Sequence, residues 1–262
     1  MEILLGFVIA LMISLTGVGA GSMTTPLLIL LLGVAPATAV GTALTFGAIV
    51  KIASVPVYAL RRQVNFRILR LLLAGGLPGV LGGALFMDWL KGGGYSRVLY
   101  FLLGSLIVSV SLFHLYRMFR PRNESGVRER PNLLWGLAFP IGAEVGFSSA
   151  GAGALGSLLL LSFTRLTAAE VVGTDLCFGL GLSAVGSLIQ VGQGNFDGAL
   201  LSKLVIGGLC GAFTGTLLAG RIRQRPLRFG LLLMLVILGF QLATHNGKAA
   251  PASHPVLQAK RK

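Results

Sequence analysis

The chain has 262 residues, of which 54% are apolar and 11% charged, and its mean hydropathy is +0.84. Apolar runs of membrane-spanning length follow one another along most of the sequence, which excludes a soluble domain. The formal net charge of +14 does not indicate nucleic-acid binding, because most arginines lie in short loops between apolar segments, where orientation in a membrane explains them better. We therefore expect the lipid bilayer, and no nucleic acid, as a partner.

Five apolar segments precede a polar linker and five follow it. In chain order they cover residues 2–16, 23–33, 36–60, 68–89 and 97–116, then 133–147, 152–163, 167–191, 198–220 and 229–244. A helix needs about 20 residues to span a bilayer, so the first two segments of each group are too short for two full crossings. They are better explained as a broken hairpin that enters the membrane and returns.

An offset of 132 residues aligns the second group of segments with the first. The matched stretches are Gly19-Ala20-Gly21 with Gly151-Ala152-Gly153, Val40-Gly41-Thr42 with Val172-Gly173-Thr174, Gly75-Gly76 with Gly207-Gly208, and Gly79 and Gly83 with Gly211 and Gly215. The chain is therefore a duplication. We assign a first transmembrane repeat to residues 1–116, a cytoplasmic linker to 117–132, a second repeat to 133–244 and a polar tail to 245–262.

Three crossings in each copy would turn the second copy upside down relative to the first. The predicted fold is thus an all-α polytopic membrane protein of two inverted structural repeats, each a broken re-entrant helical hairpin followed by three membrane-crossing helices. The distribution of charge supports this topology. With inverted repeats, the arginines of the linker and of the loops near residues 61–70, 165 and 221–228 all lie on one side of the membrane. The positive-inside rule makes that side cytoplasmic and puts the N-terminus outside. The final LQAKRK would then also lie outside, against the rule, and the last segment could itself be re-entrant.

The stretch GVGAGSMTTPLL, residues 17–28, combines helix-breaking glycines with hydroxyl side chains inside an apolar N-terminus. A cleaved signal peptide is a poor explanation, because the region before it carries Glu2 and no Lys or Arg, and the same GAG recurs in mid-chain. Broken backbone at membrane depth is tolerated where it lines a cavity, and matched breaks in two halves mark a binding site. The alternative is that the small residues only let helices pack closely.

The first break places Ser22, Thr24 and Thr25 at the start of a half-helix over 23–33, with Pro26 in its first turn. Free N–H groups and the positive end of a helix suit an anion there. Ser148 and Ser149 precede the second break and are expected to serve in the same way. The predicted substrate-binding residues are Gly19, Gly21, Ser22, Thr24, Thr25, Thr42, Lys51, Ser148, Ser149, Gly151, Gly153 and Thr174.

Three ionisable residues lie deep within apolar segments, where charge is costly and indicates function. Lys51 is ten residues from Arg61, about 15 Å along a helix, and its repeat partner is Ser183. Glu144 stands where the first copy has Met12, and Asp175 where it has Ala43. We predict Lys51 as the anion ligand and Asp175 or Glu144 as the proton carrier, since a buried carboxylate can bind a proton. The alternative is an internal pair in which Lys51 and a carboxylate neutralise each other.

The sequence has no pattern typical of an enzyme or a metal centre. Cys177 and Cys210 lie in apolar segments without metal-ligand spacing, and the histidines lie near segment ends or in the tail, without HExxH or a serine triad nearby. We expect no catalytic residues, no metal and no cofactor.

The order of motifs resembles one known family. The pattern G-x-G-x-G-S at Gly17–Ser22, a proline-led half-helix, A-x-x-x-G-T-x-L at Ala37–Leu44 and a degenerate second copy are similar to the TauE/SafE sulfite exporter family, also called toluene sulfonate uptake permeases. The resemblance covers about residues 2–244. It implies a bacterial inner-membrane secondary transporter that exports sulfite, organosulfonates or related small anions and is driven by the proton gradient. An anion channel or uniporter with the same half-helix ends is the alternative. The sequence leaves the substrate, the direction of transport and the oligomeric state open.

Overall fold

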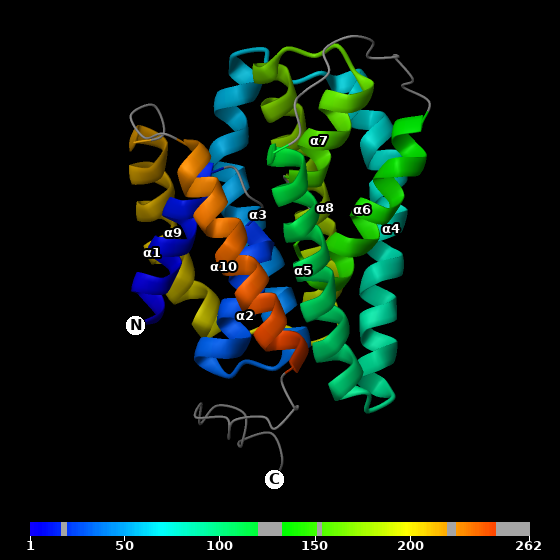
Figure 1. Cartoon of the computed structure of the whole chain (residues 1–262), viewed down its shortest axis with the longest axis vertical. Helices are drawn as coiled ribbons and strands as arrows, with labels where there is room; N and C mark the ends of the chain where they lie inside the picture. Colours follow the sequence, from blue (N-terminus) through cyan, green and yellow to red (C-terminus); the bar gives the residue numbers. More distant parts are fainter. Residues whose placement is uncertain (17–19, 120–132, 151–153, 219–223, 245–262) are drawn as a thin grey trace.

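The computed structural model describes residues 1–16, 20–119, 133–150, 154–218 and 224–244 (Figure 1). Within these ranges the chain forms ten α-helices and no β-strand. The helices are α1 (Glu2–Thr16), α2 (Ala20–Leu32), α3 (Pro36–Leu60), α4 (Phe66–Gly92), α5 (Ser96–Phe119), α6 (Leu134–Ser148), α7 (Ala154–Phe163), α8 (Ala168–Gly192), α9 (Gly198–Leu218) and α10 (Gln224–Thr244). The helical fold expected from the apolar segments is confirmed.

Among the described residues, five helices contain an apolar stretch long enough to cross a membrane. These stretches are Pro36–Ala53, Phe66–Gly92, Ser96–Met118, Ala169–Gly192 and Gly198–Gly215. The sequence predicted six crossings, and the sixth candidate, α10, has 21 residues but a shorter apolar part, Phe229–Thr244. The hairpin helices α1, α2, α6 and α7 have 15, 13, 15 and 10 residues, too few to span a bilayer at 1.5 Å per residue.

The helices alternate in direction along the long axis of the molecule. In Figure 1, α1, α3, α5, α7 and α9 run away from the end where the N-terminus lies, and the five even-numbered helices run back toward it. Each helix of α6–α10 therefore runs opposite to the helix five places before it. The chain segments 61–65 and 164–167, which join α3 to α4 and α7 to α8, lie at the end opposite the N-terminus.

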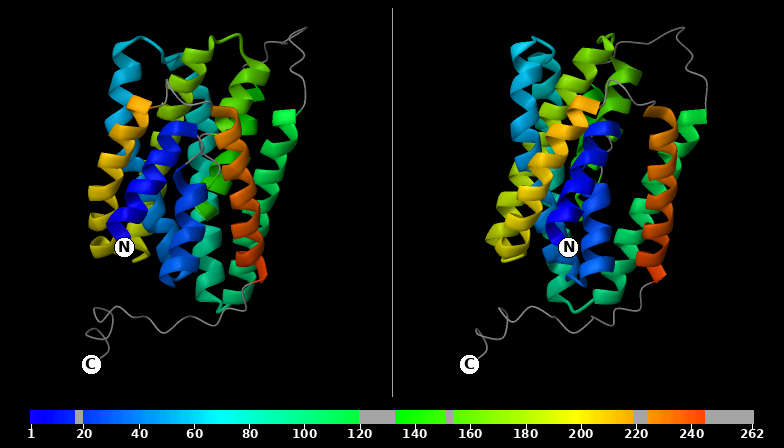
Figure 2. Two further views of the ribbon diagram at one scale, coloured as in Figure 1. Left: turned by 60° about the vertical axis from the view of Figure 1, so that its left-hand side comes forward. Right: turned by 90° about the vertical axis from the view of Figure 1, so that its left-hand side faces the viewer.

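The two halves hold each other through glycine-lined helix contacts. α6 packs along α4, and α1 packs along α9, as Figure 2 shows for the second pair. A Cβ added at Gly75, Gly79 or Gly83 would overlap the backbone of α6, and one at Gly207, Gly211 or Gly215 would overlap α1. Small residues let helices approach this closely in membranes, where packing rather than hydrophobic burial drives their association.

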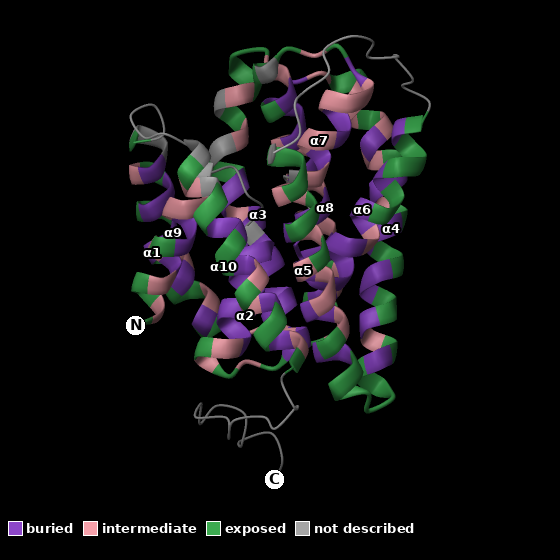
Figure 3. Cartoon of the chain, in the orientation of Figure 1, coloured by how far each residue is buried: buried purple, intermediate pink, exposed green. Residues whose placement is uncertain are grey.

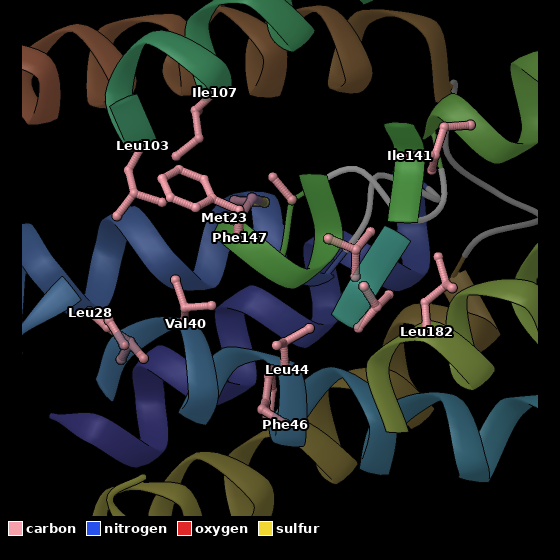
Figure 4. Packing of buried hydrophobic residues seen from close by; sticks show 14 of the residues in the cluster. Met23, Leu28, Val40, Leu44, Phe46, Leu103, Ile107, Ile141, Phe147 and Leu182 are labelled. Atoms are coloured by element: carbon pink, nitrogen blue, oxygen red, sulfur yellow. The ribbon is translucent and has the colours of Figure 1, made fainter. Parts of the chain in front are cut away.

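The apolar core lies among α2, α3, α5, α6 and α8. Figure 4 shows Met23, Val40 and Leu103 near Phe147, so side chains of both halves meet there. Large apolar residues such as Leu85 and Phe240 are exposed, and lipid would contact them in a bilayer. Figure 3 shows exposed residues along the outer helices.

Two helices, α2 and α10, begin three or more residues earlier than the apolar pattern predicted. α2 begins at Ala20 instead of residue 23, so Pro26 is its seventh residue and the prediction of a first-turn proline is wrong. Pro26 cannot donate a backbone hydrogen bond, but its neighbours Leu27 and Leu28 are buried in the core, and this packing offsets the loss. α10 begins at Gln224 instead of 229, because a helix can continue through polar residues beyond its apolar run.

Candidate functional site

The two hairpins meet inside the molecule. The hydroxyl oxygens of Thr25 on α2 and Ser149 at the end of α6 are 2.6 Å apart and hydrogen-bonded, and both side chains are buried. Gly21 lies so close to Ser149 that a Cβ would overlap its backbone. Ser149 ends α6 with φ 62°, a left-handed conformation that costs a non-glycine residue energy. The residues next to both predicted breaks are therefore in direct contact.

The other hydroxyl residues predicted at the hairpins are also buried. Ser22 and Thr24 lie in the first turns of α2, and Ser148 in the last turn of α6. The Ser148 hydroxyl donates to the carbonyl of Glu144 at 3.0 Å and accepts from the N–H of Ala150 at 3.2 Å, so it stabilises the end of α6. Gly19, Gly151 and Gly153 were predicted to bind substrate and lie outside the described residues.

Lys51 contacts its own repeat equivalent. It is buried on α3, and its ammonium donates to the hydroxyl of Ser183 at 2.9 Å and to the carbonyl of Gly179 at 3.2 Å, both on α8. Lys51 and Ser183 are 132 residues apart, the offset of the duplication. In a two-fold arrangement, equivalent residues touch only near the axis. An ammonium has three N–H donors, and the described residues supply acceptors for two of them.

Asp175 lies one turn before Gly179 on α8 and is buried. Its Oδ2 accepts a hydrogen bond from the hydroxyl of Ser157 on α7 at 2.5 Å. Its Oδ1 has no hydrogen-bond partner among the described residues. Lys51 and Asp175 attract each other electrostatically, although they do not form one of the direct ion pairs seen between described side chains. The internal pair considered from the sequence therefore stays an alternative to anion binding.

Glu144 is a second buried carboxylate, on α6 one turn before Ser148. Its Oε1 has no hydrogen-bond partner among the described residues. Burying such an oxygen without a donor is costly for a charged carboxylate and less so for a protonated one, which can itself donate. Both predicted proton carriers therefore carry an oxygen that is open to a proton.

Thr42 and Thr174 each accept a hydrogen bond from the backbone just before a helix of the other half. The Thr42 hydroxyl accepts from the N–H of Asp197, just before α9, at 3.4 Å, and the Thr174 hydroxyl accepts from the N–H of Asn65, just before α4, at 3.0 Å. Each thus binds a loop of the other half. Their role in substrate binding stays a prediction.

Sequence reasoning missed several polar contacts in the interior. Ser157 was not singled out, although the offset pairs it with the predicted residue Thr25, and Ser183 was named only as the repeat partner of Lys51. A chain of side chains also runs inward from Lys91, which donates to Asn195 at 2.5 Å; Asn195 donates to Gln190 at 2.7 Å. Gln190, a polar residue within an apolar segment, was the feature of the sequence that could have indicated these contacts.

The described residues contain no group of three or more His, Cys, Asp or Glu side chains that could hold a metal ion. Cys177 on α8 and Cys210 on α9 are free thiols. In the described part of the chain, the interior offers hydrogen-bonding groups together with the ammonium of Lys51 and the carboxyl groups of Asp175 and Glu144.

Comparison with known proteins bears on what such an interior does. The model of the family described as "Sulfite exporter TauE/SafE" matches residues 2–242. The chain is 28% identical over 256 residues to "Probable membrane transporter protein YjnA" of Bacillus subtilis (strain 168), a match that covers 92% of this chain and 98% of that protein. It is 24% identical over 245 residues to "Probable membrane transporter protein YdhB" of the same organism, again covering 92% and 98%. No solved structure matches the chain.

Proposed function

Because the chain belongs to the TauE/SafE sulfite exporter family, and both named relatives are described as probable membrane transporter proteins, we propose that it is a proton-coupled secondary active exporter and not an enzyme. Its substrates are sulfite, organosulfonates or related small anions. The partners of the protein are thus a small anion, protons and the lipid bilayer. The observation that carries the proposal is Lys51, a cation held at the contact between equivalent residues of α3 and α8.

The architecture that we propose is a pair of inverted repeats, each with a re-entrant hairpin. It is supported by the opposite directions of equivalent helices in Figure 1 and by reciprocal contacts between the halves. Gly79 lies against Phe139 while its equivalent Gly211 lies against Phe7, and residue 139 is in turn the equivalent of residue 7. Reciprocal pairs of this kind are the signature of a two-fold relation, and an axis in the membrane plane would invert one copy.

In this arrangement the substrate anion binds between the two hairpins and Lys51. The ends of the hairpin helices supply hydroxyl and N–H donors at Ser22, Thr25 and Ser149, and Lys51 supplies the charge. The single positive charge of the Lys51 ammonium can balance the charge of one small anion. Access alternates between the two sides as the halves rock about the site.

Asp175 and Glu144 couple transport to protons. Each is buried and each has an oxygen without a hydrogen-bond partner among the described residues, so each can take up a proton at little structural cost. Asp175 is the first candidate, because Lys51 acts on it electrostatically and binding of an anion at Lys51 would change that interaction.

We place the protein in the bacterial inner membrane, with the N-terminus outside and the arginine-rich loops in the cytoplasm. The position of segments 61–65 and 164–167, which carry Arg61, Arg62 and Arg165, at the end opposite the N-terminus supports this orientation.

Flux into liposomes distinguishes this function from an anion channel or uniporter. We expect purified protein to accumulate a radiolabelled sulfonate such as sulfoacetate above its external concentration under an imposed pH gradient, with the membrane potential clamped. A protonophore should abolish the accumulation, and protein-free liposomes report passive leak. If the substrate equilibrates but never accumulates, the channel or uniporter is correct.

A further inference from the structure

Two equivalent hydroxyls in the two halves have different partners. Thr25 on α2 and Ser157 on α7 are related by the offset of the duplication. Thr25 bonds to Ser149 of the opposite hairpin, whereas Ser157 donates to Asp175 within its own half. The equivalent of Asp175 is Ala43, so the first half offers Thr25 no carboxylate. The hydroxyl of the second hairpin is therefore hydrogen-bonded to an ionisable side chain, Asp175, whereas that of the first hairpin is bonded to a serine.

α7 contacts both oxygens of Asp175. Ser157 binds Oδ2 at 2.5 Å, and the preceding Gly156 lies so close to Oδ1 that a Cβ there would overlap it. Oδ1 is buried and has no hydrogen-bond partner among the described residues, although the backbone N–H of Ser157 also acts on the carboxyl group. The two oxygens of one carboxylate thus have different surroundings, one fixed by a donor and one without.

The helices that pack against α8 are α3, α4, α6 and α7. Their ionisable side chains are Lys51 and Tyr58 on α3, Arg67, Arg70, Asp88 and Lys91 on α4, and Glu144 on α6, while α7 carries none. Of these, Lys51 is the one whose charge acts on Asp175. Ser157 and Lys51 therefore define the environment in which Asp175 exchanges its proton.

We propose that Ser157 is a positioning residue, which holds Oδ2 of Asp175 so that Oδ1 takes up and releases the proton and so that the protonation of Asp175 is linked to the position of α7. The inference rests on the proposed role of Asp175 in proton coupling. In the step itself a proton from the water on one side forms an O–H bond at Oδ1 and the carboxylate becomes neutral. The same bond breaks when the proton leaves toward the other side.

The hydrogen bond from Ser157 favours the charged carboxylate, because a donor stabilises an acceptor that carries negative charge. Removing it makes the carboxyl group hold its proton to higher pH. In liposomes, Ser157→Ala should therefore keep sulfoacetate exchange between equal pools but move the pH midpoint of gradient-driven uptake upward by about one unit. Ser157→Thr retains the hydroxyl, as Thr25 does in the first half, and should keep the parent's midpoint.

Ser202→Ala is the matched control, because the Ser202 hydroxyl is exposed and donates to Gly198 of its own helix. It should leave the midpoint unchanged. If Ser157→Ala yields too little folded protein, Ser157→Cys replaces it, since a thiol of similar size is a weaker donor and should shift the midpoint less, in the same direction.

Two outcomes overturn the inference, and they can be told apart. An unchanged midpoint in Ser157→Ala, with Asp175→Asn losing gradient-driven accumulation, refutes the positioning role and leaves proton coupling through Asp175 intact. Undiminished accumulation by Asp175→Asn refutes the coupling role of Asp175 itself, and the role of Ser157 with it.

Discussion

The first half of the molecule supplies a buried cation and the second half supplies the buried carboxylates. Lys51 lies on α3, where the second half has Ser183, while Glu144 and Asp175 replace Met12 and Ala43. The helix contacts, by contrast, are alike in both halves, down to the glycines that line them. The glycine-lined helix contacts thus correspond between the two halves, whereas the charges that would bind an anion and a proton are divided between them.

The largest effect that we expect is a loss of stability when the helix contacts are disrupted, and it tests whether the two halves pack alike. Gly79→Ala and Gly211→Ala each place a methyl group against backbone, at Phe139 and Phe7, and should each destabilise the protein by about 2 kcal/mol or more. The thermal unfolding midpoint and the yield of folded protein in detergent measure this.

Gly82→Ala and Gly230→Ala are the matched controls, because nothing lies within 4 Å of an added Cβ at either position. They should behave like the parent. If only one of the two buried substitutions destabilises the protein, the two interfaces are not equivalent.

The division of charge predicts a functional difference between exchange and uphill transport. Asp175→Asn cannot release a proton, so it should keep exchange of substrate between equal pools and lose accumulation driven by a pH gradient. Glu144→Gln is expected to act in the same way if Glu144 is the carrier instead. Liposome flux with and without the gradient measures both variants.

Asp88→Asn on α4 is the control for the loss of a carboxylate as such. Asp88 is only partly buried, and it lies near the end of α4, whereas Arg67 and Arg70 lie near its start. It should transport like the parent. Parent-like accumulation by both Asp175→Asn and Glu144→Gln would show that neither carboxylate couples transport to protons.

Substitutions at the contact between the hairpins are expected to change the stability of the protein by a smaller amount. Thr25→Val removes a hydroxyl and leaves that of Ser149 without its buried partner, which should cost about 1–3 kcal/mol, whereas Thr25→Ser keeps the bond. Ser149→Gly and Ser149→Ala lose the same bond, but glycine also adopts the positive φ freely and should be the more stable by about 1 kcal/mol. Equal unfolding midpoints for the two Ser149 variants would contradict the left-handed conformation.

The fold followed from the sequence because helix length and glycine spacing are local properties. The lengths of the apolar segments located the ten helices of the described residues. The relation of the halves as inverted repeats stays a prediction, which the contact between Lys51 and Ser183, 132 residues apart, supports. The start of α2 was misplaced, because packing of Leu27 and Leu28 tolerates a proline inside the helix.

The site was harder to predict, because it depends on which side chains from distant helices meet. Buried charge identified Lys51, Asp175 and Glu144, since a single ionisable residue in an apolar run is conspicuous. The hydroxyls were less specific: Thr42 lies within a matching motif yet binds a loop, while Ser157, outside any motif, binds Asp175. Serine and threonine are common in membrane helices, and their neighbours cannot be inferred from one sequence.

Anion binding at Lys51 is the central claim, and ligand-induced thermal stabilisation tests it most directly. A ligand at 100 times its dissociation constant stabilises the folded state by about 2.7 kcal/mol. In a panel of sulfite, sulfoacetate and other sulfur anions, we expect at least one to raise the unfolding midpoint of the parent and of Lys203→Ala, which removes an exposed lysine paired with Glu2. Lys51→Ala should lose that stabilisation, and Lys51→Arg should recover part of it, because the guanidinium keeps the charge but differs in shape. An undiminished shift in folded Lys51→Ala would contradict the account.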